Sequence, residues 1–402
     1  MVKTPKTETK FIYWFAYYNL DAPSVRYRGK YPLEYLKKRY NINSYFIISS
    51  YKPNKILLFL RAYFSALLFR KSNSLIVIQR IHSHFIYATL LKFLIKVQPA
   101  NTFYDIDDAD YLDFPPKTIY HFIKNCSGVF VGSRELAKNL SKFNKNILLN
   151  TSPTPDHVIV KTKKNSVLTI GWIGDFAGEH KEALMNFFFP ALKELPFEIK
   201  LVILGVGRKH ESDFQFLKDY FKSATNINLE MPRNIDWNNE TDIQKRITEF
   251  DFGVATILDN ELHRSKSAFK LKQYLNNGVP VLSSDIPENN YFVNEGVNGF
   301  LCSTTEKFRQ RIIEINEMSN ADYMKLSIQA RQSNTNFNLT TYCKTLITRE
   351  GQSLQRKFTA NLNGIASREK QLVLETAAFG GRIDVSGNVG KIKKVEHKFK
   401  TV

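Results

Sequence analysis

Cysteine is scarce in this sequence, with three residues among 402. So few thiols argue against a disulfide framework or a structural zinc site, and we expect Cys126, Cys302 and Cys343 to be buried free thiols in a reducing compartment. The apolar content of 43% and aromatic content of 13% exclude disordered, collagen-like and low-complexity chains. At roughly 100–200 residues per domain, the length predicts two or three domains.

Long hydrophobic runs are also missing. No window reaches the ~18 uncharged apolar residues of a membrane span. The two strongest candidates, 56–69 and 85–97, are short, and charged residues such as Arg61 and Lys92 interrupt them. The first ten residues are polar and lack the apolar core of a signal peptide. We therefore expect a cytoplasmic protein that is soluble or lies on a membrane surface.

Acidic residues are rare in the first quarter of the chain. Residues 1–100 contain 17 Lys and Arg but only Glu8, Asp21 and Glu34, whereas residues 101–150 balance six of each sign. Most of the formal charge of +19 therefore belongs to the first hundred residues. Such a field attracts nucleic acid, an acidic membrane or a phosphorylated substrate. No zinc-finger, RNP or basic heptad pattern is present, so we expect no nucleic-acid partner.

The first part of the chain alternates short apolar runs with helical patterns. Apolar runs predict strands at 11–18, 45–48, 75–79, 101–106 and 128–132. Helical spacing is found at 31–40, and another helix is expected to open at Ser133. This alternation predicts an α/β domain with a doubly wound parallel sheet over residues 1–152.

The same alternation begins again after a polar, proline-containing linker at 153–166. Strands are predicted at 167–173, 199–204, 227–229, 250–257 and 279–284, and helices at 181–195, at 267–276 and as a pair over 306–348. Residues 167–357 therefore form a second Rossmann-like domain that faces the first across a cleft. Residues 358–402 fit neither domain, and they predict either a disordered tail or a hairpin, of unknown role.

A basic loop follows the strand predicted at 250–257. Ligands of open α/β sheets bind at the carboxyl ends of the strands, which is where this loop lies. Ser267 is expected to cap the next helix and Gly278 to end it. Lys266 and Lys270 then lie at the positive end of that helix, with Arg264 just upstream. A bound diphosphate would relieve their repulsion, although charge alone fits a solvated basic loop equally well.

Two further groups of residues are expected at the cleft. The loop at 284–290, with Glu288 and Asn289, leads into another helix whose amides can meet the same anion, although Glu288 also fits ordinary dipole chemistry. Asp105, Asp107 and Asp108 end a predicted strand. Close carboxylates raise one another's pKa, which favours proton handling or sugar binding, while capping of the next turn is the alternative. The D-x-D string is too common to predict a metal.

Several of these motifs occur together in one known family. The chain has G-W-I-G at 171–174, D-I-D-D at 105–108 and S-x-x-x-R at 24–28. A longer pattern runs through Arg264, Lys266, Lys270-Leu271 and Gln273-Tyr274-Leu275, then G-V-P-V at 278–281 and G-V-N-G-F-L at 296–301. From about residue 11 to residue 348, the chain resembles a retaining GT-B glycosyltransferase of glycosyltransferase family 4 (glycosyl transferases group 1).

The resemblance implies a GT-B fold and a nucleotide-sugar donor held mainly by the second domain. Lys266 and Lys270 would neutralise the diphosphate, and Asp107 would contact the transferred sugar. The other implied donor-binding residues are Gly171, Gly174, Asp175, Arg264, Gln273, Glu288 and Asn289. The donor phosphate itself would take the acceptor's proton, so neither a metal nor a cofactor is implied beside the donor.

The first domain is implied to receive the acceptor, a cell-envelope polysaccharide or a lipid-linked saccharide, at the inner face of the membrane. The implied acceptor-binding residues are Arg26, Arg28, Asp105 and Asp108. An anionic leaflet is the expected membrane partner, reached through the basic ends of 56–69, although this segment also fits a buried helix.

The family pattern is broken at three acidic positions. The paired Glu of the broader family are Ser265 and Gln273 here, and Tyr291 stands where relatives have a Glu. These changes leave open a catalytically degenerate GT-B protein that only binds a saccharide or nucleotide.

Overall fold

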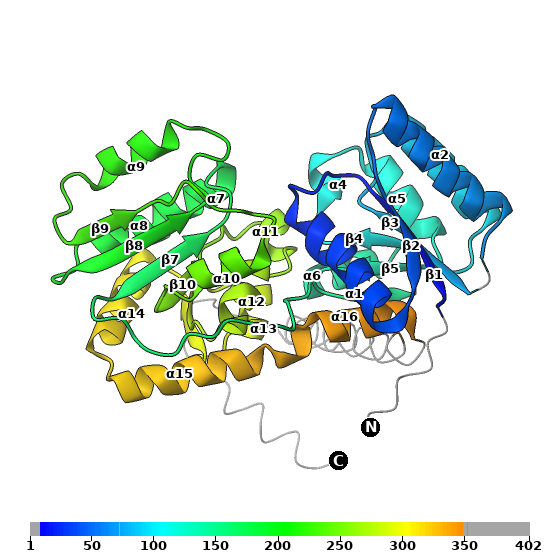
Figure 1. Ribbon diagram of the computed structural model, residues 1–402. Coiled ribbons are helices and arrows are strands. Elements are labelled where there is room, and N and C mark those ends of the chain that lie inside the picture. Colours follow the sequence, from blue (N-terminus) through cyan, green and yellow to red (C-terminus); the bar gives the residue numbers. More distant parts are fainter. Residues whose placement is uncertain (1–8, 72, 349–351, 353–402) are drawn as a thin grey trace, which may run out of the picture. The chain divides into compact units, whose positions relative to one another are not determined.

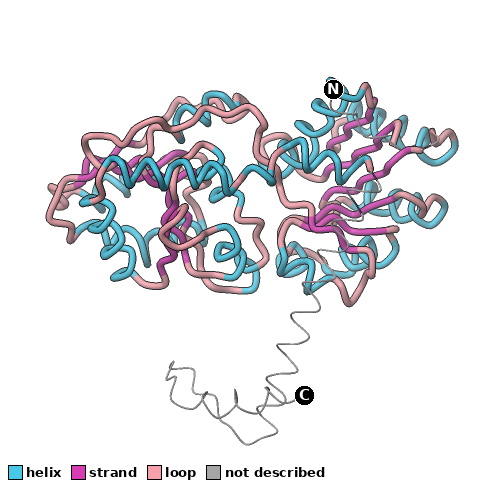
Figure 2. Tube along the Cα trace, turned by 90° about the horizontal axis from the view of Figure 1, so that it is seen from below, coloured by secondary structure: helices cyan, strands magenta, loops and turns pink. Residues whose placement is uncertain are grey.

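The computed structural model describes residues 9–71, 73–348 and 352 (Figure 1). The predicted tail at 358–402 lies outside the described residues. Within them, two six-stranded parallel sheets follow one another along the chain, each with helices on both sides (Figure 2). The predicted fold class, two Rossmann-like α/β units, is confirmed.

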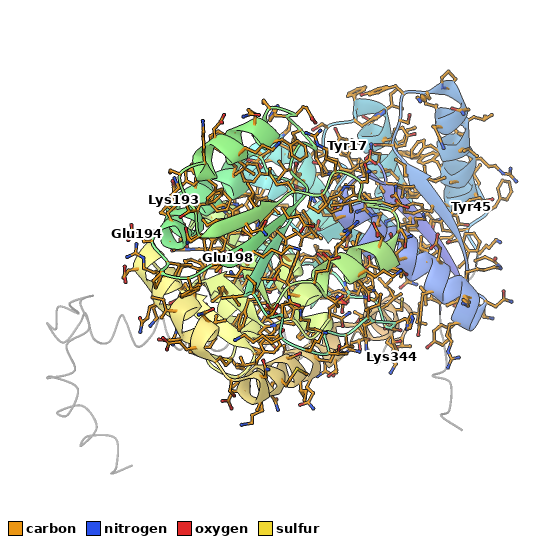
Figure 3. The ribbon with its side chains drawn as sticks, turned by 60° about the vertical axis from the view of Figure 1, so that its left-hand side comes forward. Tyr17, Tyr45, Lys193, Glu194, Glu198 and Lys344 are labelled. Atoms are coloured by element: carbon orange, nitrogen blue, oxygen red, sulfur yellow. The ribbon has the colours of Figure 1, made fainter. Side chains whose placement is uncertain are left out.

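The first sheet has the strand order β2-β1-β3-β4-β5-β6. Its strands are β1 (Phe11–Ala16), β2 (Asn43–Ile48), β3 (Ser74–Gln79), β4 (Thr102–Ile106), β5 (Gly128–Val131) and β6 (Ile147–Leu149). All six residues of β1 are buried, because parallel strands are covered on both faces. β2 is an edge strand, and its Tyr45 contacts the rings of Phe11 and Tyr13 (Figure 3).

The second sheet has the order β12-β11-β10-β7-β8-β9. Its strands are β7 (Thr169–Ile173), β8 (Ile199–Leu204), β9 (Ile227–Glu230), β10 (Phe252–Ala255), β11 (Val281–Ser284) and β12 (Gly299–Cys302). The short strands β6 and β12 were not predicted from the sequence.

Helices connect the strands of each sheet. In the first half they are the π-helical turn η1 (Val25–Lys30), α1 (Tyr31–Tyr40), α2 (Pro53–Leu68), α3 (Phe85–Val97), α4 (Asp110–Asp113), α5 (Pro116–Asn125) and α6 (Arg134–Leu140). In the second half they are α7 (Gly178–Ala183), η2 (Leu184–Phe188), α8 (Phe189–Lys193), α9 (Asp213–Phe221), α10 (Glu240–Ile247), α11 (Glu261–Arg264), α12 (Phe269–Asn276), α13 (Pro287–Phe292), α14 (Thr305–Glu317), α15 (Asn320–Ser333), η3 (Thr335–Phe337) and α16 (Leu339–Ile347).

The last part of the described chain holds three helices, α14 to α16, where a helix pair was predicted. The third of them, α16, returns to the first half. Its Tyr342, Cys343 and Leu346 are buried in the same apolar cluster as Ile12 and Trp14 of β1. Helical spacing shows that a segment has an apolar face, but it does not show which sheet that face covers. The extent predicted for the second domain, residues 167–357, therefore stays a prediction. Although α16 falls within that range, it packs on the first half of the chain.

The start of α12 differs from the prediction. The helix begins at Phe269, and Ala268 before it has a left-handed backbone with φ of 49°. Ala268 therefore occupies the N-cap position of α12, and the Ser267 side chain does not cap the helix. The helix ends as expected, with Asn277 as its C-cap residue and Gly278 next, at φ of 70°. In the described part of the chain, no helix combines the length and the apolar character needed to cross a membrane.

Candidate active site

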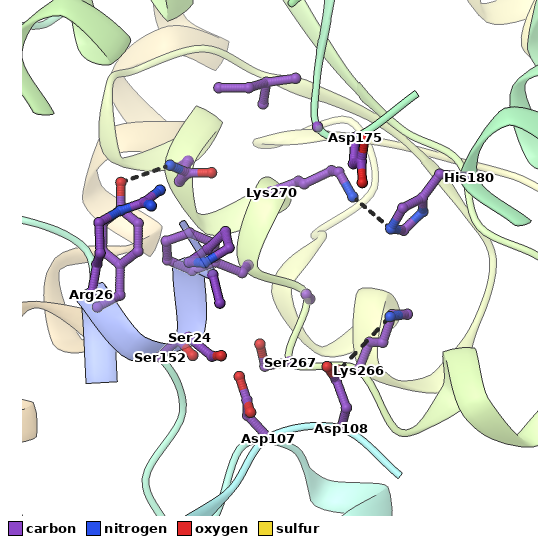
Figure 4. Close-up of a pocket in the computed structure, with 18 of the residues that line it drawn as sticks. Ser24, Arg26, Asp107, Asp108, Ser152, Asp175, His180, Lys266, Ser267 and Lys270 are labelled. Atoms are coloured by element: carbon purple, nitrogen blue, oxygen red, sulfur yellow. Dashed lines mark hydrogen bonds and ion pairs between the residues drawn. The ribbon is translucent and has the colours of Figure 1, made fainter. Parts of the chain in front are cut away.

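A cavity of about 530 Å³ lies between the carboxyl ends of the two sheets (Figure 4). The first half contributes Tyr18, Asp21, Ser24, Arg26, Tyr27, Arg80, Asp107 and Asp108 to its walls, and the second half contributes Gly174, Asp175, His180, Arg208, Lys209, Trp237, Lys266, Ser267, Lys270, Gln273 and Asn289. Parallel strands place the loops at their carboxyl ends along one edge of a sheet, which explains why these distant segments meet.

Lys266 and Lys270 line this cavity at the start of α12. The Lys266 ammonium lies 3.8 Å from an oxygen of Asp108, and Nζ of Lys270 lies 3.2 Å from Nε2 of His180 (Figure 4). The first turn of α12 contains no acidic residue. The lysines therefore add positive charge to the positive end of the helix, a combination that favours a bound anion.

Lys270 is an unusual lysine. Burial and the neighbouring Lys266 ammonium lower its pKa to about 7, from an ordinary 10.5. The same lysine, followed by burial, holds the pKa of His180 well below its usual range, so the imidazole is neutral. Nε2 of His180 can then accept a hydrogen bond from the Lys270 ammonium.

The backbone around Lys270 is shaped for this side chain. A Cβ built on Gly174 would come within 2.7 Å of Cε of Lys270. The glycine at the end of β7 therefore leaves the space that the lysine occupies. The donor-binding role implied for Gly174 stays a prediction.

Opposite the lysines, Arg80 lies among three carboxylates that follow β4. Its guanidinium nitrogens are 3.1 Å from an oxygen of Asp107, 3.1 Å from one of Asp108 and 2.5 Å from one of Asp110. The Arg80 backbone has φ of 53°, a strained conformation for a side-chain-bearing residue. The carboxylates on this side of the cavity therefore form one network around Arg80 and are not isolated acids.

Two neighbouring carboxyls in this network have opposite pKa shifts. Burial raises the pKa of Asp107 to about 6, against the opposing effect of Arg80. Burial also acts on Asp108, but the Lys266 ammonium and Arg80 outweigh it and lower its pKa to about 2. Burial thus brings the pKa of Asp107 closer to neutral pH and also raises that of Asp110, whereas the pKa of Asp108 is lowered.

The structure brings most of the predicted site residues to the cavity. Besides Asp107, Lys266 and Lys270, these are Gly174, Asp175, Gln273, Asn289, Arg26 and Asp108. Gln273 donates to the Tyr27 hydroxyl at 3.4 Å, which links α12 to η1. Arg26 donates to the backbone oxygens of Leu20 and Asp21, so its guanidinium is engaged within its own loop. The predicted roles of these residues remain predictions.

Arg28 and Asp105 do not reach the cavity, contrary to their predicted place in an acceptor site. Both are fully buried, and they form an ion pair with two hydrogen bonds. Arg28 also donates to the backbone oxygen of Asn150 at 2.7 Å. A buried guanidinium and a buried carboxylate must satisfy each other, which leaves neither for a ligand. They stabilise the first half from within.

Arg264 does not line the cavity, contrary to the expected group of three cations. Its exposed guanidinium pairs with Asp259 through two hydrogen bonds. Gly171 is also displaced from its predicted role, because it lies inside β7, where a Cβ would come within 2.2 Å of the Phe250 ring. This glycine serves core packing rather than donor binding.

Glu288 does not line the cavity but ties the two halves together beside it. Its carboxylate accepts from the Arg134 backbone at 3.1 Å and from the Arg134 guanidinium at 2.8 Å. In a second contact between the halves, the Ser133 hydroxyl donates a hydrogen bond of 2.6 Å to the backbone oxygen of Ser265. The predicted donor contact of Glu288 is therefore replaced by a contact between domains, since α13 faces α6 there.

Arg80, His180 and Arg208 line the cavity, although the sequence motifs did not include them. Arg208 follows the carboxyl end of β8 and lies over the Trp237 ring at 4.5 Å. The rule that ligands bind at the carboxyl ends of strands could have found Arg80 and Arg208, because they follow β3 and β8. His180 lies inside the first turn of a helix and carries no such sequence pattern.

Comparisons with known proteins give one match to a family model. Residues 167–317 match the family model described as Glycosyl transferases group 1. No curated protein matches the chain in sequence.

Solved structures share the architecture over most of the chain. HepE from Anabaena, in complex with UDP-glucose, is 11% identical with a TM-score of 0.58, and the match covers 84% of this chain and 98% of HepE. Sucrose-phosphate synthase from Thermosynechococcus elongatus is 11% identical with a TM-score of 0.62, covering 88% and 100%. The lipopolysaccharide outer core galactosyltransferase WaaB is 14% identical with a TM-score of 0.56, covering 87% and 99%. At these identities the likeness concerns the fold, which is GT-B.

Proposed function

We propose that the chain is a retaining group 1 glycosyltransferase that moves a sugar from a nucleotide-sugar donor to a cell-envelope polysaccharide or lipid-linked saccharide. One observation carries the proposal. Lys266 and Lys270, at the start of α12, face the Arg80–Asp107 pair across a single cavity whose walls come from both sheets. Such a cavity has a cationic side for a diphosphate and a carboxylate side for hydroxyl groups.

The donor diphosphate is assigned to the cationic side. Lys266 and Lys270 supply two ammonium groups next to the unpaired amides of a helix N-terminus, where anions are bound most readily. Gln273 and Asn289 lie on the same wall and offer amide groups to the rest of the donor. HepE, which shares this fold, is in complex with UDP-glucose, so UDP-sugars are the first donors to test.

The transfer step needs charge stabilisation at the leaving group. A bond forms between the acceptor hydroxyl oxygen and the anomeric carbon while the bond from that carbon to the donor phosphate oxygen breaks. The acceptor proton passes to a phosphate oxygen, so acceptor and phosphate share one face of the sugar and the configuration is retained. Lys266 and Lys270 neutralise the charge that develops on the diphosphate. We assign to Asp107 a contact with a hydroxyl of the transferred sugar.

The acceptor is assigned to the first half of the chain. Its excess of Lys and Arg over acids favours a phosphorylated or membrane-bound acceptor over a neutral one in solution. We place the protein in the cytoplasm, at the inner face of the membrane, where a lipid-linked saccharide and a nucleotide-sugar are both available.

Thermal shift with nucleoside diphosphates and their sugars, followed by mass spectrometry of donor turnover, tests this proposal. Lys270→Ala is expected to lower donor turnover by about 10²–10³-fold, the usual effect of removing one group that stabilises developing charge. Lys218→Ala removes an exposed lysine of α9 and serves as the matched control. Both variants should unfold at nearly the wild-type temperature.

Two results would contradict the proposal. Turnover by Lys270→Ala at the wild-type rate would remove this lysine from the reaction. Tight nucleotide-sugar binding without any turnover, by the wild-type protein and with a panel of saccharide acceptors, would favour the alternative of a degenerate binding protein.

A further inference from the structure

The outward side of α2 is apolar, although the helix is packed on the fold. Phe59 and Tyr63 lie on its buried side. On the opposite side, Leu57, Phe64 and Leu68 expose 69%, 48% and 63% of their surface. Their spacing of seven and four residues places them on one stripe of the helix. The sequence expectation that 56–69 is buried therefore holds for one side only.

The neighbouring helix α3 repeats this arrangement. Its Phe85, Phe93 and Val97 expose 78%, 52% and 48% of their surface, while Tyr87 and Leu91 are buried. α2 and α3 pack against each other, so their outward stripes form one surface. We call this surface, made of the exposed residues of α2 and α3, the apolar face. Large exposed apolar patches of this kind mark interaction sites.

The charge around the apolar face has one sign. No Asp or Glu stands between Glu34 and Asp105, so neither helix contains an acid. Arg61 lies within the α2 stripe, and the other cations of the two helices are Lys55, Lys92 and Lys96. A second copy of the same face would meet like charges. Apolar side chains with basic neighbours and no acids complement an anionic lipid surface.

The apolar face begins close to the cavity. α2 and α3 start at the carboxyl ends of β2 and β3, the edge of the sheet along which the cavity lies. There the ring of Tyr51, 70% exposed, stacks on His84 at 4.0 Å. Tyr17, at the end of β1 (Figure 3), contacts His82 at 4.3 Å and the cavity-lining Tyr18 at 4.9 Å. One group of aromatic rings thus lies at the start of the apolar face, and a second group lies at the mouth of the cavity.

We propose that the apolar face docks on an anionic lipid bilayer and places the mouth of the cavity at the membrane surface. Leu57, Phe64, Leu68, Phe85 and Phe93 would enter the boundary between headgroups and acyl chains, while Arg61 and Lys96 would meet lipid phosphates. The placement of the cavity mouth at the membrane rests on the proposed function, because it has a purpose only if the acceptor is held in the membrane. The docking itself can be tested without any turnover.

Vesicle flotation with the purified full-length protein tests the docking. The wild-type protein should float with vesicles of phosphatidylglycerol and phosphatidylcholine, and much less with phosphatidylcholine alone. Phe64→Glu combined with Leu68→Glu should weaken binding to the mixed vesicles by more than about tenfold. The change replaces two apolar side chains that would be buried in the bilayer with charged ones. Ile328→Glu, at a 51% exposed site on α15, is the matched control and should float like the wild type.

The charge contribution has its own variant. Arg61→Gln should weaken binding to the mixed vesicles by about fivefold, the effect of one cation near an anionic surface, and added salt should reduce the difference. Absence of wild-type flotation, or equal flotation of the Phe64→Glu, Leu68→Glu double variant, would overturn the proposal. Dimerisation that this double variant abolishes, without vesicle binding, would overturn it in favour of a second copy.

Flotation and turnover separate the two proposals. The double variant should retain the wild-type rate of donor hydrolysis in solution, because neither side chain lines the cavity. Vesicle binding without any donor turnover would support the docking and contradict the proposed transfer. Donor turnover without vesicle binding would contradict the docking alone.

Discussion

Binding of the donor diphosphate is expected to bring a proton to Lys270. In the free protein, burial and Lys266 hold the pKa of Lys270 at about 7, so above that pH the amine is largely neutral. A diphosphate beside Nζ has the opposite effect, because it favours the charged form. If the bound lysine regains its ordinary pKa of 10.5, one proton is taken up between these two values.

The sign of the pH effect follows from this uptake. Raising the pH removes the proton that the complex needs, so affinity falls as the pH rises above about 7. For a free pKa of about 7, the dissociation constant should rise about 25-fold between about pH 7.5 and about pH 9, or about 2 kcal/mol. A terminal phosphate has its second pKa near about 6, so the ligand itself contributes little in this range.

Isothermal titration calorimetry measures both quantities. Titrations with UDP in two buffers of different ionisation enthalpy give the number of protons taken up, and a pH series gives the slope of the affinity. Lys270→Arg is the control, because a guanidinium stays charged throughout and should make the affinity nearly independent of pH. Wild-type affinity that stays flat over this range, or an equal slope in Lys270→Arg, would refute the assignment of Lys270 to the diphosphate.

Two further predictions concern the first half of the chain. Asp107→Asn should lower donor turnover by at least about tenfold with little change in nucleotide affinity, because the proposal assigns Asp107 to the transferred sugar and not to the diphosphate. Steady-state kinetics with calorimetry checks this, and unchanged turnover would contradict it. Arg28→Met leaves the buried carboxylate of Asp105 without its partner and should destabilise the fold by about 3–5 kcal/mol; urea denaturation measures the loss, and a variant of near wild-type stability would show that the pair is not needed.

Much of the fold was predictable because its pattern is local. A run such as the FIYWFA of β1 is apolar throughout, as a parallel strand covered on both faces must be, and the pattern repeats along both halves. The rule that ligands lie at the carboxyl ends of such strands then located Lys266, Lys270 and Asp107 at one cavity. Periodicity and chain order are properties of neighbouring residues, so no tertiary information was needed.

The tertiary structure decided how the charges pair. Arg28 and Asp105 are 77 positions apart and form an ion pair in the interior. Arg264 pairs with Asp259 and does not line the cavity. Arg80 entered the site because the end of β3 lies beside the end of β4. Coulomb energy depends on distance in space and on burial, and neither can be read from spacing along the chain.

The same limit applies to the apolar face. The segment 56–69 is apolar almost all the way round, so its sequence fits a buried helix and a membrane-facing one equally well. Packing of Phe59 and Tyr63 on the fold left Leu57, Phe64 and Leu68 outside. Local pattern thus sets which segments become helices and strands, whereas the contacts between them determine which side chains remain free to meet a ligand or a membrane, because burial is a property of the assembled fold.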